Sequence, residues 1–246
     1  MKKRSLKQGV FFLFIVALLA SYLHWYTRDV IDQVIYDLSF SNTYINSKKG
    51  IDDVLNEWEH IEGRALPAEL KAYSLLDEGE YKNVLASGLY YVLRKKDVYK
   101  KVVGHIRIKD LMARDKYYRR SFIFSRDTLY WGLDKRILYK VLALQDALEG
   151  KGYDRDAFWI RHGHRHPQYN LKVGGAPKSR HLRGDAVDLV IKDINRDGRY
   201  TKADKDIVLD LCEKQIIGNQ GGIGRYPWSR TVHIDVRGKR ARWDSY

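Results

Sequence analysis

The sequence has a single cysteine, Cys212, among its 246 residues. One thiol cannot form an internal disulfide, and Cys212 lies in an apolar helical pattern, so we expect it to be a small buried side chain. Cysteine usage therefore does not indicate the cellular compartment. The sequence also lacks zinc-finger spacing, RNA-binding aromatic motifs, internal repeats and low-complexity tracts. Nucleic acid is for these reasons not an expected partner.

Acidic residues are scarce relative to basic ones. The chain has 45 Lys and Arg against 31 Asp and Glu, which leaves a net charge of +14. Such a balance favours an anionic partner, such as an acidic polymer or a membrane surface, and says nothing about the fold. The hydrophobic content of 44% is typical of a globular protein. The length suffices for one good-sized core and a smaller second unit.

The N-terminus has the pattern of a secretion signal or a signal anchor. An apolar run over residues 10–23 follows a basic cluster within residues 2–7. The run is short for a span of about 20 residues, but extension through Trp25 and Tyr26 approaches that length. No small-x-small cleavage site is evident. We therefore expect residues 1–26 to be an uncleaved anchor that leaves the rest of the chain exported, facing the periplasm or cell wall, or to release a secreted protein if cleaved.

Residues 27–130 are predicted to form a mostly helical accessory region. Apolar residues recur at helical spacing, for example Ile51, Val54, Leu55 and Trp58. A basic run over residues 94–101 is expected to be a solvated helix face. The pattern assigns no chemistry to this region, which leaves open a stalk, a small domain, or an extension packed on the rest of the chain.

Two segments near the C-terminus carry the candidate chemistry. His181 and Asp188 lie seven residues apart, with Gly184 at a predicted tight turn and an apolar strand pattern after Asp188. Residues 232–236 alternate, so His233 and Asp235 share one face of a second predicted strand. If the two strands are neighbours, His181, Asp188 and His233 converge. Two imidazoles and one carboxylate leave a tetrahedral zinc ion with one open position, as in catalytic sites.

The combined motif resembles a known family. Ser-x-His-x-x-Gly-x-Ala-x-Asp over residues 179–188, followed by His-x-Asp at 233–235, resembles the zinc D-Ala-D-Ala carboxypeptidases, which share the fold of the hedgehog signalling domain. Residues 221–227 with Arg242-Trp243, and residues 163–170, resemble the murein endopeptidase branch. The resemblance covers residues 133–243. It implies an α+β fold, with a small antiparallel sheet flanked by helices, for a peptidase domain over residues 131–246.

The same resemblance implies a function and a set of site residues. The chain is expected to be a zinc peptidase acting on the peptide stems of bacterial peptidoglycan, of D,D- or L,D-carboxypeptidase or endopeptidase type. Arg165 stands at the position of the family's arginine and would bind a substrate carboxylate, unless it is a surface arginine. Ser179 would bind substrate or support its loop. The three histidines at 162, 164 and 166 are not expected to be primary ligands.

The general base is less evident. Related peptidases often carry an acidic residue three positions before the last histidine ligand, where this chain has Arg230. Asp235 is our substitute, with a second interpretation in which its carboxylate orients a histidine ligand. Asp185 is a weaker candidate.

A second metal motif occupies residues 193–204. Its spacing is that of an EF-hand calcium loop, with Gly198 at the sharp turn and Asp204 in place of the usual final Glu, as in dockerin modules. A strand enters the loop instead of a helix, and the alternative is a turn that binds no ion. The predicted calcium ligands are Asp193, Asn195, Asp197, Arg199, Thr201 and Asp204. We expect calcium there to be structural.

Two rival functions remain open from the sequence. One is a non-catalytic zinc- and calcium-binding module, because the hedgehog relatives show that such a site can serve binding. The other is a membrane-anchored protein that binds an anionic polymer through its basic N-terminal region, with metal sites that are only structural.

Overall fold

The computed structural model describes residues 44–79, 81–112 and 127–244, together with part of a helix within residues 15–34. Residues 44–246 form one compact unit and residues 1–43 another. The predicted anchor over residues 1–26 lies largely outside the described residues. Among those that are described, no helix has the length and apolar character needed to cross a membrane.

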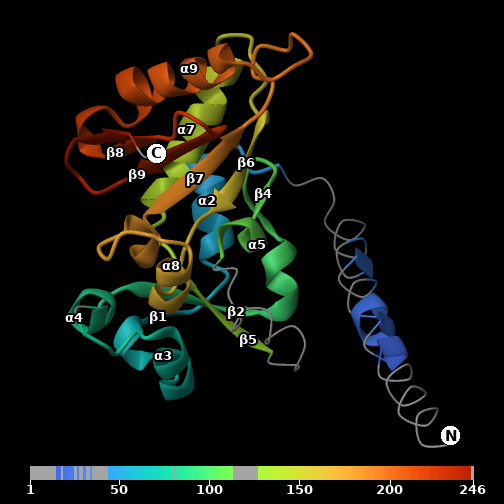
Figure 1. Cartoon of the computed structure of the whole chain (residues 1–246), viewed down its shortest axis with the longest axis vertical. Helices are drawn as coiled ribbons and strands as arrows, with labels where there is room; N and C mark the ends of the chain where they lie inside the picture. The colour runs from blue at the N-terminus through green and yellow to red at the C-terminus, as the bar shows by residue number, and fades with distance from the viewer. Residues whose placement is uncertain are drawn as a thin grey trace, which may run out of the picture. The chain divides into compact units, whose positions relative to one another are not determined.

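A five-stranded sheet carries the histidine and aspartate motifs (Figure 1). Its strands are β6 (Phe158–His162), β7 (Ala186–Ile191), β8 (Gly222–Arg225), β9 (Thr231–Asp235) and β10 (Ala241–Asp244), in the order β10-β8-β9-β7-β6. Neighbours are antiparallel except for the parallel pair β8 and β10. The predicted neighbourhood of the two motif strands is confirmed, since β7 pairs with β9 and Asp188 lies opposite His233.

Two helices flank this sheet, which confirms the predicted α+β class. Helix α7 (Arg136–Glu149) buries an apolar stripe that includes Val141 and Leu148, as its helical spacing predicts. Helix α9 (Lys202–Leu211) continues into one π turn (Cys212–Ile216), where Cys212 is buried. Helix α9 packs on both α7 and β7.

The region before α7 mixes short helices with short strands. Its helical elements are α2 (Lys48–Leu55), η1 (Gly63–Ala65), α3 (Ala68–Ser74), α4 (Tyr81–Leu85), η2 (Lys95–Tyr99) and α5 (Ile108–Leu111). Its strands are β1 (His60–Glu62), β2 (Leu89–Arg94), β3 (Lys101–Val103), β4 (Ile106–Arg107) and β5 (Thr128–Gly132). Strands β1, β2 and β5 form an antiparallel sheet, and β3 pairs with β4. Residues 89–94, within the region predicted to be mostly helical, form strand β2, because their backbone hydrogen-bonding partners lie on β1 and β5.

This region packs directly against the metal motif. Leu182, the neighbour of His181, belongs to an apolar cluster whose other buried members come from residues 66–90. Helix α3 contacts α8 (Pro167–Lys172), and α5 contacts β6. The sequence left open a stalk, a small domain or a packed extension for residues 27–130. The contacts of the described part are those of an extension packed on the rest of the chain. The functional boundary near residue 130 stays a prediction.

Candidate metal centre

A short helical turn places His181 over the sheet. Residues Arg180–Arg183 form a 3₁₀ turn (η3) that Gly184 ends at φ +66°. A Cβ at position 184 would also overlap the carbonyl oxygen of Gly132. Glycine is therefore required both by the left-handed backbone and by the close approach of a neighbouring strand. The chain then turns directly into β7, which carries Asp188.

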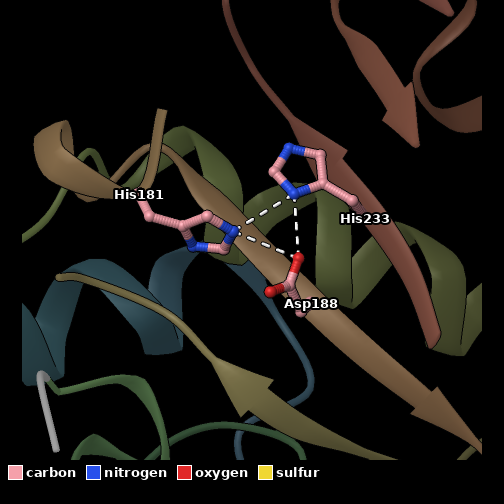
Figure 2. Close-up of side chains that lie close together, drawn as sticks. All are labelled: His181, Asp188 and His233. Carbon is pink, nitrogen blue, oxygen red and sulfur yellow. Dashed lines mark hydrogen bonds and ion pairs between the residues drawn. The ribbon is translucent and has the colours of Figure 1, made fainter. Parts of the chain in front are cut away.

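The three predicted ligands converge, as Figure 2 shows. His181 Nε2 lies 3.1 Å from Asp188 Oδ1 and 3.2 Å from His233 Nδ1, and the last two atoms are 2.9 Å apart. Bonds of about 2.0–2.1 Å to a tetrahedral zinc ion separate ligand atoms by about 3.3 Å. Within the described part of the chain, this is the one group of at least three His, Cys, Asp or Glu side chains that could hold a metal ion.

The other ring nitrogen of His181 and of His233 forms a hydrogen bond. His181 Nδ1 donates to the carbonyl of Gly163 at 2.7 Å, and His233 Nε2 donates to Asp235 Oδ2 at 3.2 Å. These bonds direct the unprotonated Nε2 of His181 and Nδ1 of His233 toward the Asp188 carboxylate. Three acceptor atoms then face one another, an arrangement that a bound cation would stabilise. The donor set therefore fits a zinc ion.

Burial and local charge keep His181 and Asp188 in their ligating forms, whereas the carboxylates around His233 favour its protonation when no ion is bound. His181, Asp188 and His233 are 2%, 4% and 4% exposed. Burial lowers the pKa of His181 to about 4, so its imidazole is neutral at pH 7. Burial would raise the pKa of Asp188, but the neighbouring histidines outweigh it and hold that pKa well below its usual range. Burial also opposes protonation of His233, whereas its contacts with Asp188 and Asp235 raise its pKa overall.

The second oxygen of Asp188 has two partners that the sequence pattern did not predict. Asp188 Oδ2 accepts a hydrogen bond from Arg165 Nη2 at 2.7 Å and lies 3.1 Å from His162 Nδ1. Arg165 is buried, so its guanidinium orients the carboxylate directly. The sequence did place Arg165 at the site, but only as a ligand for substrate. The spacing of residues along the sequence could not predict that Arg165 contacts Asp188. Arg165 follows β6, and β6 is brought beside β7 only by the pairing of the sheet.

Asp235 lies on the far side of His233 from the three converging atoms. It is 0% exposed, and its carboxylate accepts hydrogen bonds from Gly222 N at 3.0 Å and Arg237 Nε at 2.8 Å, as well as from His233. It is not among the residues that line the cavity beside the metal centre. This geometry favours the orienting role over that of a general base. Asp185 pairs with Arg180 and also lies outside that lining.

The metal centre opens onto a basic cavity of about 740 Å³. Of the described carboxylates, Asp188 alone lines it. Ser179 also lines it, together with Tyr226, Trp228 and Trp243. The cationic lining residues are Arg161, Arg165, Lys178, Arg180 and Arg237. This excess of positive charge suits a substrate that carries carboxylates.

His164 and His166, the other histidines of the 162–166 tract, lie outside the metal centre. His164 is buried with its ring against Tyr90, and its ring centroid lies 4.9 Å from that of His166. Neither belongs to the group that could hold a metal.

The predicted calcium loop has the expected turn but not a gathered set of carboxylates. Gly198 has a φ of +92°, and Asp193 accepts hydrogen bonds from the backbone of Asp197 and Gly198 at 3.0 and 2.8 Å. Asp204 caps helix α9 through Thr201 N and also accepts from Ile194 N. Its oxygens therefore serve backbone donors, and calcium binding stays a prediction.

The fold and the centre together define the class. A mixed α+β unit places two imidazoles and one carboxylate on the wall of an open cavity, which is the arrangement of zinc metallopeptidases. Residues 125–235 match the family model described as Peptidase M15, which is the zinc D-Ala-D-Ala carboxypeptidase family that the motifs of this segment resemble. Comparison with curated proteins and with solved structures gave no match.

Proposed function

We propose that this chain is a zinc peptidase that cleaves the peptide stems or crosslinks of bacterial peptidoglycan, as a carboxypeptidase or an endopeptidase. The observation that carries the proposal is the convergence of three acceptor atoms whose other imidazole nitrogens are already engaged. Such a centre, at the wall of a basic cavity, suits hydrolysis of a peptide that bears carboxylates. The match to the M15 family supports the same reading.

The residues at the site have different roles in the proposed reaction. Zinc bound to His181, Asp188 and His233 would supply Lewis-acid polarisation of the scissile carbonyl and would lower the pKa of a coordinated water to about 7. Arg165 holds the Asp188 carboxylate, and its position at the cavity also suits contact with a substrate carboxylate. Asp235 holds the His233 ring. Arg230, at the position of the family's acidic residue, stacks 4.3 Å from the ring of Tyr200 and does not line the cavity.

The direct test is zinc content together with turnover. The chain, purified without added metal, should contain one zinc ion and should release peptide fragments from purified muropeptides. A chain that binds zinc but leaves muropeptides intact would favour the non-catalytic binding module. A chain that neither binds zinc when it is supplied nor cleaves would exclude the peptidase.

Calcium at residues 193–204 is proposed as a structural ion that neutralises Asp193 and Asp197 and fixes the loop between β7 and α9. Saturation at about 100 times the dissociation constant adds about 2.7 kcal/mol, which for this chain length raises the Tm by about 5–10 °C. Zinc-loaded protein should show this rise in a thermal scan with added calcium, and an Asp193→Asn variant should show less. An unchanged Tm in the zinc-loaded parent would contradict the proposal.

Residues 1–26 are proposed as a signal anchor that places the cavity where peptidoglycan lies, with no role for nucleic acid. The basic cluster before the apolar run supports export of the C-terminal part. Deletion of residues 1–26 should move the protein from the membrane fraction to the soluble fraction after cell breakage. Equal recovery of both forms in the soluble fraction would oppose the anchor.

A further inference from the structure

Trp228 stands exposed at the rim of the metal cavity. It is 88% exposed, whereas Trp131 and Trp58 are buried. It lies on a turn closed by the hydrogen bond from Ser229 N to the carbonyl of Tyr226, at 3.0 Å. Tyr226, Trp228 and Ser229 all line the cavity that holds His181 and His233. The face of this indole is therefore open to a ligand that enters the cavity.

The turn is held from beneath by a buried lysine. Lys205, on α9, is 6% exposed, and its Nζ donates to the carbonyls of Tyr226 and Ser229 at 2.6 and 2.8 Å. In the part of the chain that the structure describes, no carboxylate forms an ion pair with Lys205. Burying an ammonium group against two neutral acceptors is costly. Its two hydrogen bonds tie the turn to α9.

A second contact fixes the far end of the same turn. The guanidinium of Arg230 lies 4.3 Å from the centre of the Tyr200 ring. Both Tyr200 and Lys205 belong to the segment formed by the 193–204 loop and α9. The rim is therefore pre-organised, and a ligand that binds Trp228 need not order the turn first.

The exposure of Trp228 indicates the chemistry of its ligand. A pocket that binds an apolar side chain would enclose it, whereas most of the surface of the Trp228 indole is exposed to water. A sugar ring fits such a surface, because its C–H face packs on an aromatic ring while its hydroxyl edges stay hydrated. Nearby, Arg161 and Lys178 line the same cavity, and no ion pair with a described carboxylate occupies either of them, so anionic groups attached to such a sugar can also be bound.

We propose that Trp228 is a stacking platform for a sugar of the peptidoglycan glycan strand, and that Lys205 is a positioning residue that holds this platform. The inference rests on the proposed function, since a peptide stem at the metal centre would place its attached sugar beyond the cavity rim. With this site the protein would bind both the peptide and the glycan of the polymer.

Binding of glycan tests the platform without any cleavage. The zinc-loaded full chain is mixed with soluble glycan strands freed of peptide, and the dissociation constant is measured. Trp228→Ala should weaken binding by about tenfold. The matched control is Trp159→Ala, which removes a 41% exposed tryptophan outside the cavity lining and should leave binding unchanged. Lys205→Met should weaken binding in the parent but add nothing in a Trp228→Ala background, because it acts through the turn.

Several outcomes would overturn the inference. These are glycan binding that is absent in the parent, binding that survives Trp228→Ala, or additive effects of Lys205→Met and Trp228→Ala. Binding of the parent to anionic phospholipid vesicles that is lost in Trp228→Ala, without glycan binding, would make Trp228 a membrane contact instead.

Kinetics separate this inference from the proposed function. Two substrates are compared, a disaccharide peptide and the same peptide without sugars. Trp228→Ala should reduce the preference for the disaccharide peptide, expressed as a ratio of kcat/KM values, by about tenfold. An unchanged ratio, with both peptides still cleaved, would overturn the platform and leave the peptidase intact. If the parent cleaves neither peptide, the proposed function fails, and glycan binding still decides the role of Trp228.

Discussion

Replacing His181 with alanine is expected to remove zinc and reduce muropeptide turnover by at least about 10³-fold. The estimate assumes that metal-assisted stabilisation of the transition state is worth about 4 kcal/mol, at 1.36 kcal/mol for each factor of ten. Two donors would remain, Asp188 and His233, too few to hold the ion in an open tetrahedral site. Elemental analysis of the purified variant, with turnover measured on the same sample, provides the measurement.

The control for this prediction is His60→Ala. His60 is an exposed histidine on β1 and is not part of the metal group, so this variant should keep its zinc and its turnover. A combined His181→Ala and His233→Ala variant should contain no zinc at all. Retained zinc in that double variant would place the ion elsewhere in the chain and would remove the basis of the proposed mechanism.

Asp235→Asn is expected to weaken zinc binding about 10–100-fold, which is the usual effect of losing a carboxylate that orients a histidine ligand. Asparagine has nearly the same size, but its NH₂ group would face donors, since His233 Nε2 and Arg237 Nε both donate to this carboxylate. The buried donors left unsatisfied should also lower the free energy of unfolding by about 3 kcal/mol. A chelator competition and a denaturant titration measure the two effects.

This substitution also decides between the two roles considered for Asp235. Removing a general base would leave zinc affinity intact. Unchanged zinc affinity with abolished turnover would therefore support the role of Asp235 as the general base. Asp244→Asn is the matched control, because Asp244 is an exposed aspartate on β10 that pairs with Arg225 at the surface. It should alter stability by less than about 1 kcal/mol and leave zinc affinity unchanged.

The sequence by itself determined the local parts of the metal centre. The run before β7 contains a glycine that the left-handed turn at position 184 requires. The alternation over residues 232–236 set which side chains of β9 face together, so His233 and Asp235 share a side of the sheet. Helix α7 likewise follows from its apolar spacing. These features depend on backbone geometry within a few residues, and a sequence pattern reports such geometry directly.

Only the tertiary structure decided which partner each polar atom meets. The side of β9 that holds Asp235 was predictable, but its hydrogen bonds with Gly222 and Arg237 depend on how β8 and the chain beyond β9 pack. The contact of Arg165 with Asp188 depends on the pairing of β6 with β7. The contact of Lys205 with the Trp228 turn joins elements about 20 residues apart. A hydrogen bond is short and directional, so its partner is set by the packing of distant segments, and periodicity along the chain carries no record of that packing.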